Sequence, residues 1–118
     1  MKWWKSFGHA WHGIRYCFTT QLNFRIHLVV LLIVILLGAI VKLSATEWLI
    51  ITGFAALVLT LEVVNTAIEY LCDTITRDIH PVIKTVKDIS AAAVLIAVAG
   101  SVVSGAIIFF PKMLDLFR

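Results

Sequence analysis

Ionisable and carboxamide side chains are concentrated in residues 61–94, between two strongly apolar parts of the chain. They are Glu62, Asn65, Glu69, Asp73, Asp78, His80, Lys84, Lys87 and Asp88. A charged side chain in a hydrocarbon environment costs roughly 3 kcal/mol or more on insertion scales, so charges placed there usually have a function. This stretch is therefore the first candidate for a functional site.

Helical spacing places most of these side chains on two helical faces. At about 100° per residue, four of them share one narrow helical face, which we call the polar ladder. The polar ladder consists of Glu62, Asn65, Glu69 and Asp73, and a face on the next helix holds Lys84, Lys87, Asp88 and Ala91. Glu69 lies ~10 Å from Glu62 along the axis, so the polar ladder leads from an interface into apolar sequence. Antiparallel packing would bring its carboxylates opposite the lysines.

Three functions are compatible with this arrangement: phosphoryl transfer, proton-coupled transport and a structural role. Carboxylates with a carboxamide suit Mg²⁺ shared with nucleotide phosphates, a lysine supplies charge for phosphate, and a deeply set carboxylate can deprotonate an alcohol. Together these are the parts of phosphoryl transfer. A proton-coupled transporter could use the same groups as a relay, and a structural subunit could pair them as salt bridges. The chain has no glycine-rich phosphate-binding motif, so the residues alone leave all three functions open.

Composition places these residues in a membrane protein of a single domain, residues 1–118. Apolar residues make up 61% of the chain, and its mean hydropathy is +1.00. The formal net charge of +3 is spread along membrane flanks, which favours anionic headgroups and phosphates as partners over nucleic acid. Cys17 and Cys72 fit no metal-binding spacing, and we expect both to be free thiols.

Hydrophobic periodicity predicts an all-α integral membrane fold. Residues 2–20 form an amphipathic interfacial helix with Trp3, Phe7 and Trp11 on its apolar face. Membrane spans are expected at about 24–43, 47–72 and 87–110, with Thr46 as an N-cap, a polar turn at 74–81 and a helix end at Pro111.

Lysine and arginine counts predict the orientation of the chain. Four of these residues precede the first span and three follow the second, against one after the first span and two at the C-terminus. The N-terminus and the charged turn are therefore expected in the cytoplasm, and the C-terminus outside.

Several motifs resemble one known family. They are ExxNTAIExxxD at 62–73, IHP at 79–81, KDxxAAAVL at 87–95, SFxxAxxGI at 6–14 and NFRIH at 23–27. Together they resemble the prokaryotic diacylglycerol kinase and undecaprenol kinase family over nearly the whole chain. The resemblance implies a homotrimer in the bacterial cytoplasmic membrane, with active sites between subunits, that transfers the γ-phosphate of Mg-ATP to a lipid hydroxyl.

The resemblance also implies roles for individual residues. It makes Glu62 the general base and Glu69 a metal ligand, with Asn65 and Asp73 as polar support. The residues expected to contact ATP are Lys87, Asp88, His80, Asp78, Glu69, Gln21 and His9. Those expected along the lipid substrate path are Glu62, Ala91, Asn23, Arg25 and Trp11.

Gln21 departs from the family pattern. Just before the NFRIH run the family usually carries a Glu that shares the metal, and a neutral amide there should bind Mg²⁺ more weakly. Ala91 is a smaller change, since some diacylglycerol-using members have Ser there. The IHPVIKTVKD loop and the GAIIFFPK tail look more like the undecaprenol kinases, so undecaprenol is favoured over diacylglycerol as the acceptor.

Overall fold

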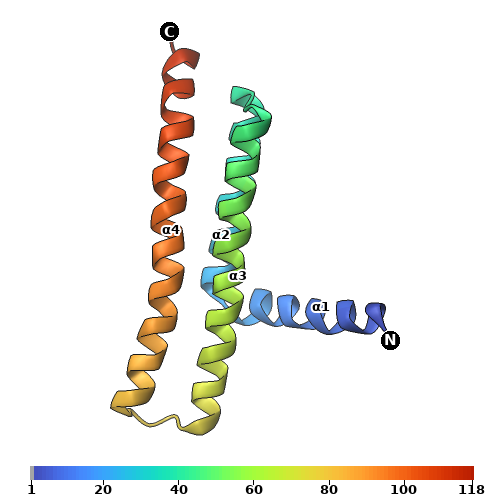
Figure 1. Cartoon of the computed structure of the whole chain (residues 1–118), viewed down its shortest axis with the longest axis vertical. Coiled ribbons are helices and arrows are strands. Elements are labelled where there is room, and N and C mark those ends of the chain that lie inside the picture. Colours follow the sequence, from blue (N-terminus) through green and yellow to red (C-terminus); the bar gives the residue numbers. More distant parts are fainter. Residues whose placement is uncertain (1) are drawn as a thin grey trace.

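The computed structural model describes residues 2–118, and this range is entirely helical apart from short connections. Its helices are α1 (Trp3–Thr20), α2 (Leu22–Val41), α3 (Ala45–Ile75) and α4 (Pro81–Leu116), arranged as Figure 1 shows. The last three are long and apolar enough to cross a membrane. The predicted all-α membrane fold is thus confirmed. Helices α3 and α4 are longer than the spans that hydropathy alone predicted, whereas α2, with 20 residues, has the predicted length but begins two residues earlier.

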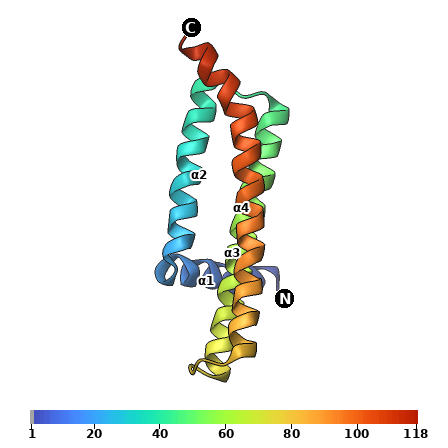
Figure 2. The same cartoon turned by 90° about the vertical axis from the view of Figure 1, so that its left-hand side faces the viewer.

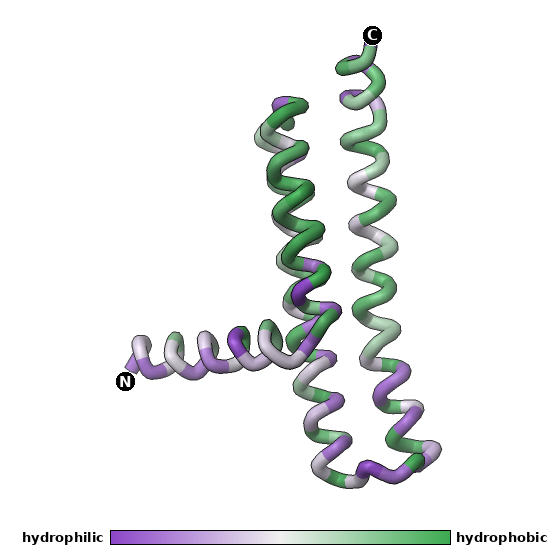
Figure 3. The backbone as a smooth tube through the Cα atoms, turned by 180° about the vertical axis from the view of Figure 1, so that it is seen from behind, coloured by the Kyte–Doolittle hydropathy of each residue, from purple (hydrophilic) through white to green (hydrophobic). Residues whose placement is uncertain are grey.

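Helix α1 runs across the direction that the other three helices share (Figure 1). Polar and apolar residues alternate along it, whereas the upper parts of α2, α3 and α4 are almost uniformly apolar (Figure 3). This is the geometry of an interfacial helix lying in the membrane plane. The chain turns at Gln21, which is extended, and Arg25 donates a 2.7 Å hydrogen bond to the Phe18 carbonyl across the turn.

Helices α3 and α4 pack antiparallel along most of their length and make the main contact of the fold. With 31 and 36 residues they are roughly 46 and 54 Å long, which exceeds the ~30 Å hydrocarbon layer. Their connected ends extend past the level of α1 in both side views, and these ends carry the polar residues (Figures 2 and 3). The polar end of the α3–α4 pair therefore lies at and beyond the plane that α1 marks.

The turn between α2 and α3 differs from the prediction, since Ser44 and not Thr46 is the N-cap of α3. The Ser44 hydroxyl accepts from the Glu47 amide at 3.2 Å, and the Glu47 carboxylate accepts from the Ser44 amide at 2.9 Å. This is a capping box, and it satisfies two backbone donors that a helix start otherwise leaves unpaired. Gly38 permits the close approach here, because a Cβ at this position would lie 2.7 Å from the Trp48 ring.

The predicted helix end at Pro111 is wrong, because α4 continues through it to Leu116. Proline removes one amide donor, but this position lies near the helix terminus, where α4 changes direction (Figure 2). Lys112, the next residue, forms a 3.1 Å ion pair with Glu47 of α3. This pair ties the last turns of α4 to the start of α3.

Candidate active site

Glu62 is the deepest acidic residue of the chain and only 2% exposed. It lies on α3, and its closest basic partner is Nε2 of His27 on α2, 3.8 Å from Glu62 Oε2. One turn further on, the Thr66 hydroxyl donates to the Glu62 backbone carbonyl at 2.9 Å, which occupies that hydroxyl within the helix. Because burying a carboxylate is costly, Glu62 is the residue that most strongly indicates a functional site in this structure.

Asn65 and Glu69 continue the polar ladder toward the connected end of α3 and α4. Asn65 is 7% exposed, and its Nδ2 lies 3.4 Å from Glu69 Oε1, so the amide orients the Glu69 carboxylate. The Oδ1 atom of Asn65 is buried and has no hydrogen-bond partner in the described residues. Such an atom is unusual in a folded protein and marks a place where a ligand or water can bind.

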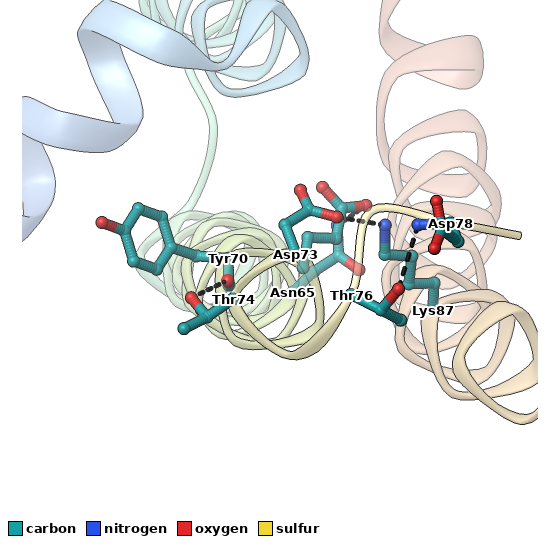
Figure 4. A network of polar contacts seen from close by, with 8 residues as sticks. Asn65, Tyr70, Asp73, Thr74, Thr76, Asp78 and Lys87 are labelled. Carbon is teal, nitrogen blue, oxygen red and sulfur yellow. Dashed lines mark hydrogen bonds and ion pairs between the residues drawn. The ribbon is translucent and has the colours of Figure 1, made fainter. Parts of the chain in front are cut away.

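The predicted meeting of acids and lysines occurs between Asp73 and Lys87. Lys87 Nζ lies 2.6 Å from Asp73 Oδ1, and Figure 4 shows the Lys87 side chain reaching from α4 to α3. Lys84 does not cross to α3, because it pairs with Asp88 of its own helix at 2.6 Å. The polar ladder therefore faces one lysine directly, with Lys84 and Asp88 exposed beside it.

The connection between α3 and α4 holds Asp78 and His80 at the same end of the molecule. The Asp78 amide donates to Thr76 Oγ1 at 3.0 Å, which shapes the turn drawn in Figure 4. His80 is the N-cap of α4, with its Nδ1 accepting from the Val82 amide at 3.2 Å, and Pro81 occupies the first helical position. Both side chains are exposed to solvent near the polar ladder.

The predicted residues of the N-terminal segment do not join this cluster within one chain. His9 and Trp11 are exposed on α1, whose C-terminal part packs on α3 through Tyr16 and Tyr70 and whose N-terminal end runs outward from α3 and α4 (Figure 1). Arg25, predicted along the lipid path, donates to the Phe18 carbonyl, and Asn23 is exposed. Ala91, predicted along the same path but located on α4, is exposed as well. The amide of Gln21 donates to Thr20 Oγ1 at 3.2 Å, and no hydrogen bond joins it to α3 within residues 2–118.

An apolar cavity of about 460 Å³ lies between α2, α3 and α4. Its wall is mainly aliphatic and aromatic, with Phe54 and Phe109 among the larger side chains, and His27 is its one ionisable residue. The cavity thus connects the hydrocarbon region with the residue that contacts Glu62.

His27 and Ser90 are polar residues that sequence reasoning missed. In the sequence His27 stands out only as the last residue of the NFRIH run, although a histidine near the start of an apolar helix is a possible partner for Glu62. Ser90 is 8% exposed on the face of α4 that packs on α3, and its hydroxyl has no partner in the described part of the chain. Register places it near Glu69, one turn from Lys87, but only the packed pair of helices establishes this register.

Known proteins resemble this chain over most of its length. Residues 8–109 match the family described as prokaryotic diacylglycerol kinase. The chain is 40% identical over 109 residues to an undecaprenol kinase of Bacillus subtilis, covering 92% of this chain and 89% of that protein. A diacylglycerol kinase of Synechocystis is 38% identical over 112 residues, which cover 94% of this chain and 64% of that protein.

A more distant relative is the diacylglycerol kinase of Escherichia coli, 28% identical over 106 residues that cover 90% of this chain and 87% of that protein. A match over most of the chain favours the kinase over the transporter and structural alternatives, and it implies ATP as the co-substrate. The chain therefore belongs to the prokaryotic diacylglycerol kinase family and is a multi-pass membrane lipid kinase.

Proposed function

We propose that this lipid kinase transfers the γ-phosphate of ATP to the hydroxyl of undecaprenol in preference to diacylglycerol. The observation that carries the proposal is Glu62, a carboxylate 2% exposed at the inner end of the polar ladder. Its helix joins an apolar cavity to a water-exposed cluster of charges. The choice of undecaprenol is supported by the 40% identity to a protein of that name.

In this proposal Glu62 is the general base. A lipid hydroxyl approaching from the membrane meets a carboxylate from which bulk water is largely excluded. Glu62 takes the hydroxyl proton as the oxygen attacks the γ-phosphate, and a positioned base contributes about 10²-fold to 10⁴-fold in rate. Asn65 holds the neighbouring Glu69 carboxylate in place through its 3.4 Å contact.

ATP would bind at the water-exposed end of α3 and α4. Lys87 supplies positive charge for phosphate and is held by Asp73 at 2.6 Å, while Asp88, Asp78 and His80 surround the same end. An exposed pair such as Asp73–Lys87 adds little to stability, so its charges can be redirected to a nucleotide at small cost. His9 and Gln21 belong to the same proposed site but come from the N-terminal segment.

Magnesium fits the oxygen donors present, with Glu69 as the main ligand and Gln21 as a weaker one. Within residues 2–118 no three His, Cys, Asp or Glu side chains gather as a metal cluster, and Mg²⁺ bound with nucleotide needs only one or two protein carboxylates. The unpartnered Asn65 Oδ1 beside Glu69 adds a further oxygen of the type that Mg²⁺ prefers. Bound Mg²⁺ would neutralise phosphate charge.

A homotrimer would complete this site. His9 and Trp11 are exposed on α1, and the N-terminal end of this helix runs outward from α3 and α4 (Figure 1), so both side chains can contact a neighbouring subunit. Asn23, Arg25 and Ala91 would then line the path of the lipid headgroup. The proposed location is the bacterial cytoplasmic membrane, with the N-terminus and the charged connection in the cytoplasm and the C-terminus outside.

The test is transfer of labelled phosphate from Mg-ATP in mixed micelles that contain undecaprenol or diacylglycerol at equal mole fraction. We expect labelled lipid with both acceptors and a higher kcat/KM for undecaprenol. Equal or higher kcat/KM for diacylglycerol contradicts the proposed acceptor, and the absence of labelled lipid with either contradicts the proposed reaction. Chemical crosslinking in the same micelles tests for a trimer.

A further inference from the structure

His27 is the basic residue closest to the proposed general base. Its Nε2 lies 3.8 Å from Glu62 Oε2, the one pairing of Glu62 with a basic group within residues 2–118. This separation is longer than a hydrogen bond, so a small side-chain movement or one bridging water would connect the two groups. The contact joins α2 to α3 at the inner end of the polar ladder.

The two partners differ in their access to the surroundings. The Glu62 side chain is 3% exposed, whereas that of His27 is 22% exposed and lies on the wall of the apolar cavity. The Glu62 carboxylate is therefore enclosed, while His27, six residues into α2, has one side toward Glu62 and another open to the cavity. Imidazole can accept a proton on one nitrogen and release it again near neutral pH.

The surroundings of His27 contain few other charged groups. From α3 it faces Glu62, with Glu69 further along the same ladder. Helix α4 contributes only uncharged residues to the cavity that His27 lines, such as Val98 and Ser101. On its own helix the nearest cation, Arg25, is turned to the Phe18 carbonyl of α1. Glu62 is thus the group with which His27 can exchange a proton.

We propose that His27 is a positioning residue that carries the substrate proton away from Glu62 after each phosphoryl transfer. This inference rests on the proposed role of Glu62 as base. The lipid O–H bond breaks, its proton moves to the Glu62 carboxylate, and the lipid oxygen bonds to the γ-phosphorus as ADP leaves. The Glu62 proton then moves to His27 Nε2 and finally to water, which returns Glu62 to its ionised form and His27 to the neutral form.

The test compares His27→Gln, His27→Ala, Glu62→Gln and the control His12→Gln, which alters an exposed histidine of α1. Glutamine can still donate a hydrogen bond to Glu62 but cannot carry a proton. We expect His27→Gln to lower kcat on the order of 10²-fold with KM for ATP unchanged. His12→Gln should keep the parent kcat. Added imidazole should raise the kcat of His27→Ala in a saturable manner, because the truncation leaves space for it beside Glu62.

The outcomes separate this inference from the proposed function. Full kcat in His27→Gln, or a folded His27→Ala whose kcat does not respond to imidazole, overturns the role of His27 even if Glu62→Gln is inactive. Turnover retained by Glu62→Gln overturns the base itself. Gel filtration and circular dichroism in micelles establish which variants fold, and His27→Gln, similar in size to the parent residue, decides the matter if His27→Ala does not.

Discussion

Helices α3 and α4 are joined by an ion pair near each end, and the two pairs use the same chemistry. Asp73 and Lys87 meet at 2.6 Å near the connection between the helices, and Glu47 and Lys112 meet at 3.1 Å near the opposite end. The second pair is in fact the less exposed, at 25% and 29% against 51% and 35%. Neither distance nor burial of the pair itself identifies the site.

The difference lies in what surrounds each pair. Glu47 is already used by the capping box with Ser44, and the residues that follow it into the membrane, such as Ile51 and Phe54, are apolar. Inward from Asp73 the helix presents Glu69, Asn65 and Glu62, of which the last two are buried. Buried polar atoms without complete partners, such as Asn65 Oδ1, therefore distinguish a candidate active site from a structural contact.

Removing one carboxylate charge from each of these two regions of α3 should give the largest difference in activity between them. We expect Glu62→Gln to lower kcat by about 10²-fold to 10⁴-fold, since the amide cannot accept the lipid proton. Glu47→Gln removes the same charge from the same helix and should keep kcat within experimental error. The measurement is labelled phosphate transfer at saturating Mg-ATP, with crosslinking to verify that both variants assemble alike. Equal losses in the two variants would contradict the assignment of chemistry to one end.

The two lysines provide a second comparison with a smaller effect. Lys87→Met should lower kcat/KM for ATP on the order of tenfold to 10²-fold, because a point charge for phosphate is lost. Lys112→Met makes the same substitution at the other end of α4 and should leave KM for ATP unchanged. Initial rates over a range of ATP concentrations give both constants. If Lys112→Met raises KM as much as Lys87→Met does, the nucleotide does not bind where we propose.

Much of the fold follows from the sequence, because hydropathy and helical periodicity are local properties. The amphipathic stretch with Trp3 and Trp11 and the apolar runs predicted α1 and the three long helices. Helix ends were less predictable, since they depend on tertiary partners. Ser44 caps α3 through its reciprocal contact with Glu47, and α4 passes Pro111 into a last stretch in which Lys112 pairs with Glu47 of α3.

The polar ladder could also be predicted, because its spacing places it on one helical face whatever the helix packs against. The partners across helices could not. Lys84 and Lys87 share a face by spacing, yet only Lys87 reaches α3, since Lys84 finds Asp88 one turn away. The contact of His27 with Glu62 depends on how α2 leans on α3, which no pattern within either helix specifies.

Gln21 gives a third prediction, which sharpens the proposed metal site at the polar end. Gln21→Glu adds the carboxylate that this position usually has in the family, so the Mg²⁺ concentration for half-maximal activity should fall several-fold. Titration of activity against free Mg²⁺ at fixed ATP measures it, and Mn²⁺ binding followed by electron paramagnetic resonance gives a readout independent of turnover. Glu47→Gln serves as the control. An unchanged or higher requirement for Mg²⁺ would exclude Gln21 from the site.

The smallest expected effect concerns the start of α3, where Glu47 pairs with Lys112. Ser44→Ala removes the side-chain acceptor of the capping box and should destabilise α3 by about 1 kcal/mol, with KM for ATP unchanged. Thr46→Ala is the matched control, because Thr46 is exposed and its side chain makes no hydrogen bond within residues 2–118. Thermal unfolding in micelles, followed by circular dichroism, should place Ser44→Ala a few degrees below the parent and Thr46→Ala level with it. The reverse order would mean that Thr46 caps the helix, and a change in KM would mean that this end of the molecule communicates with the nucleotide site.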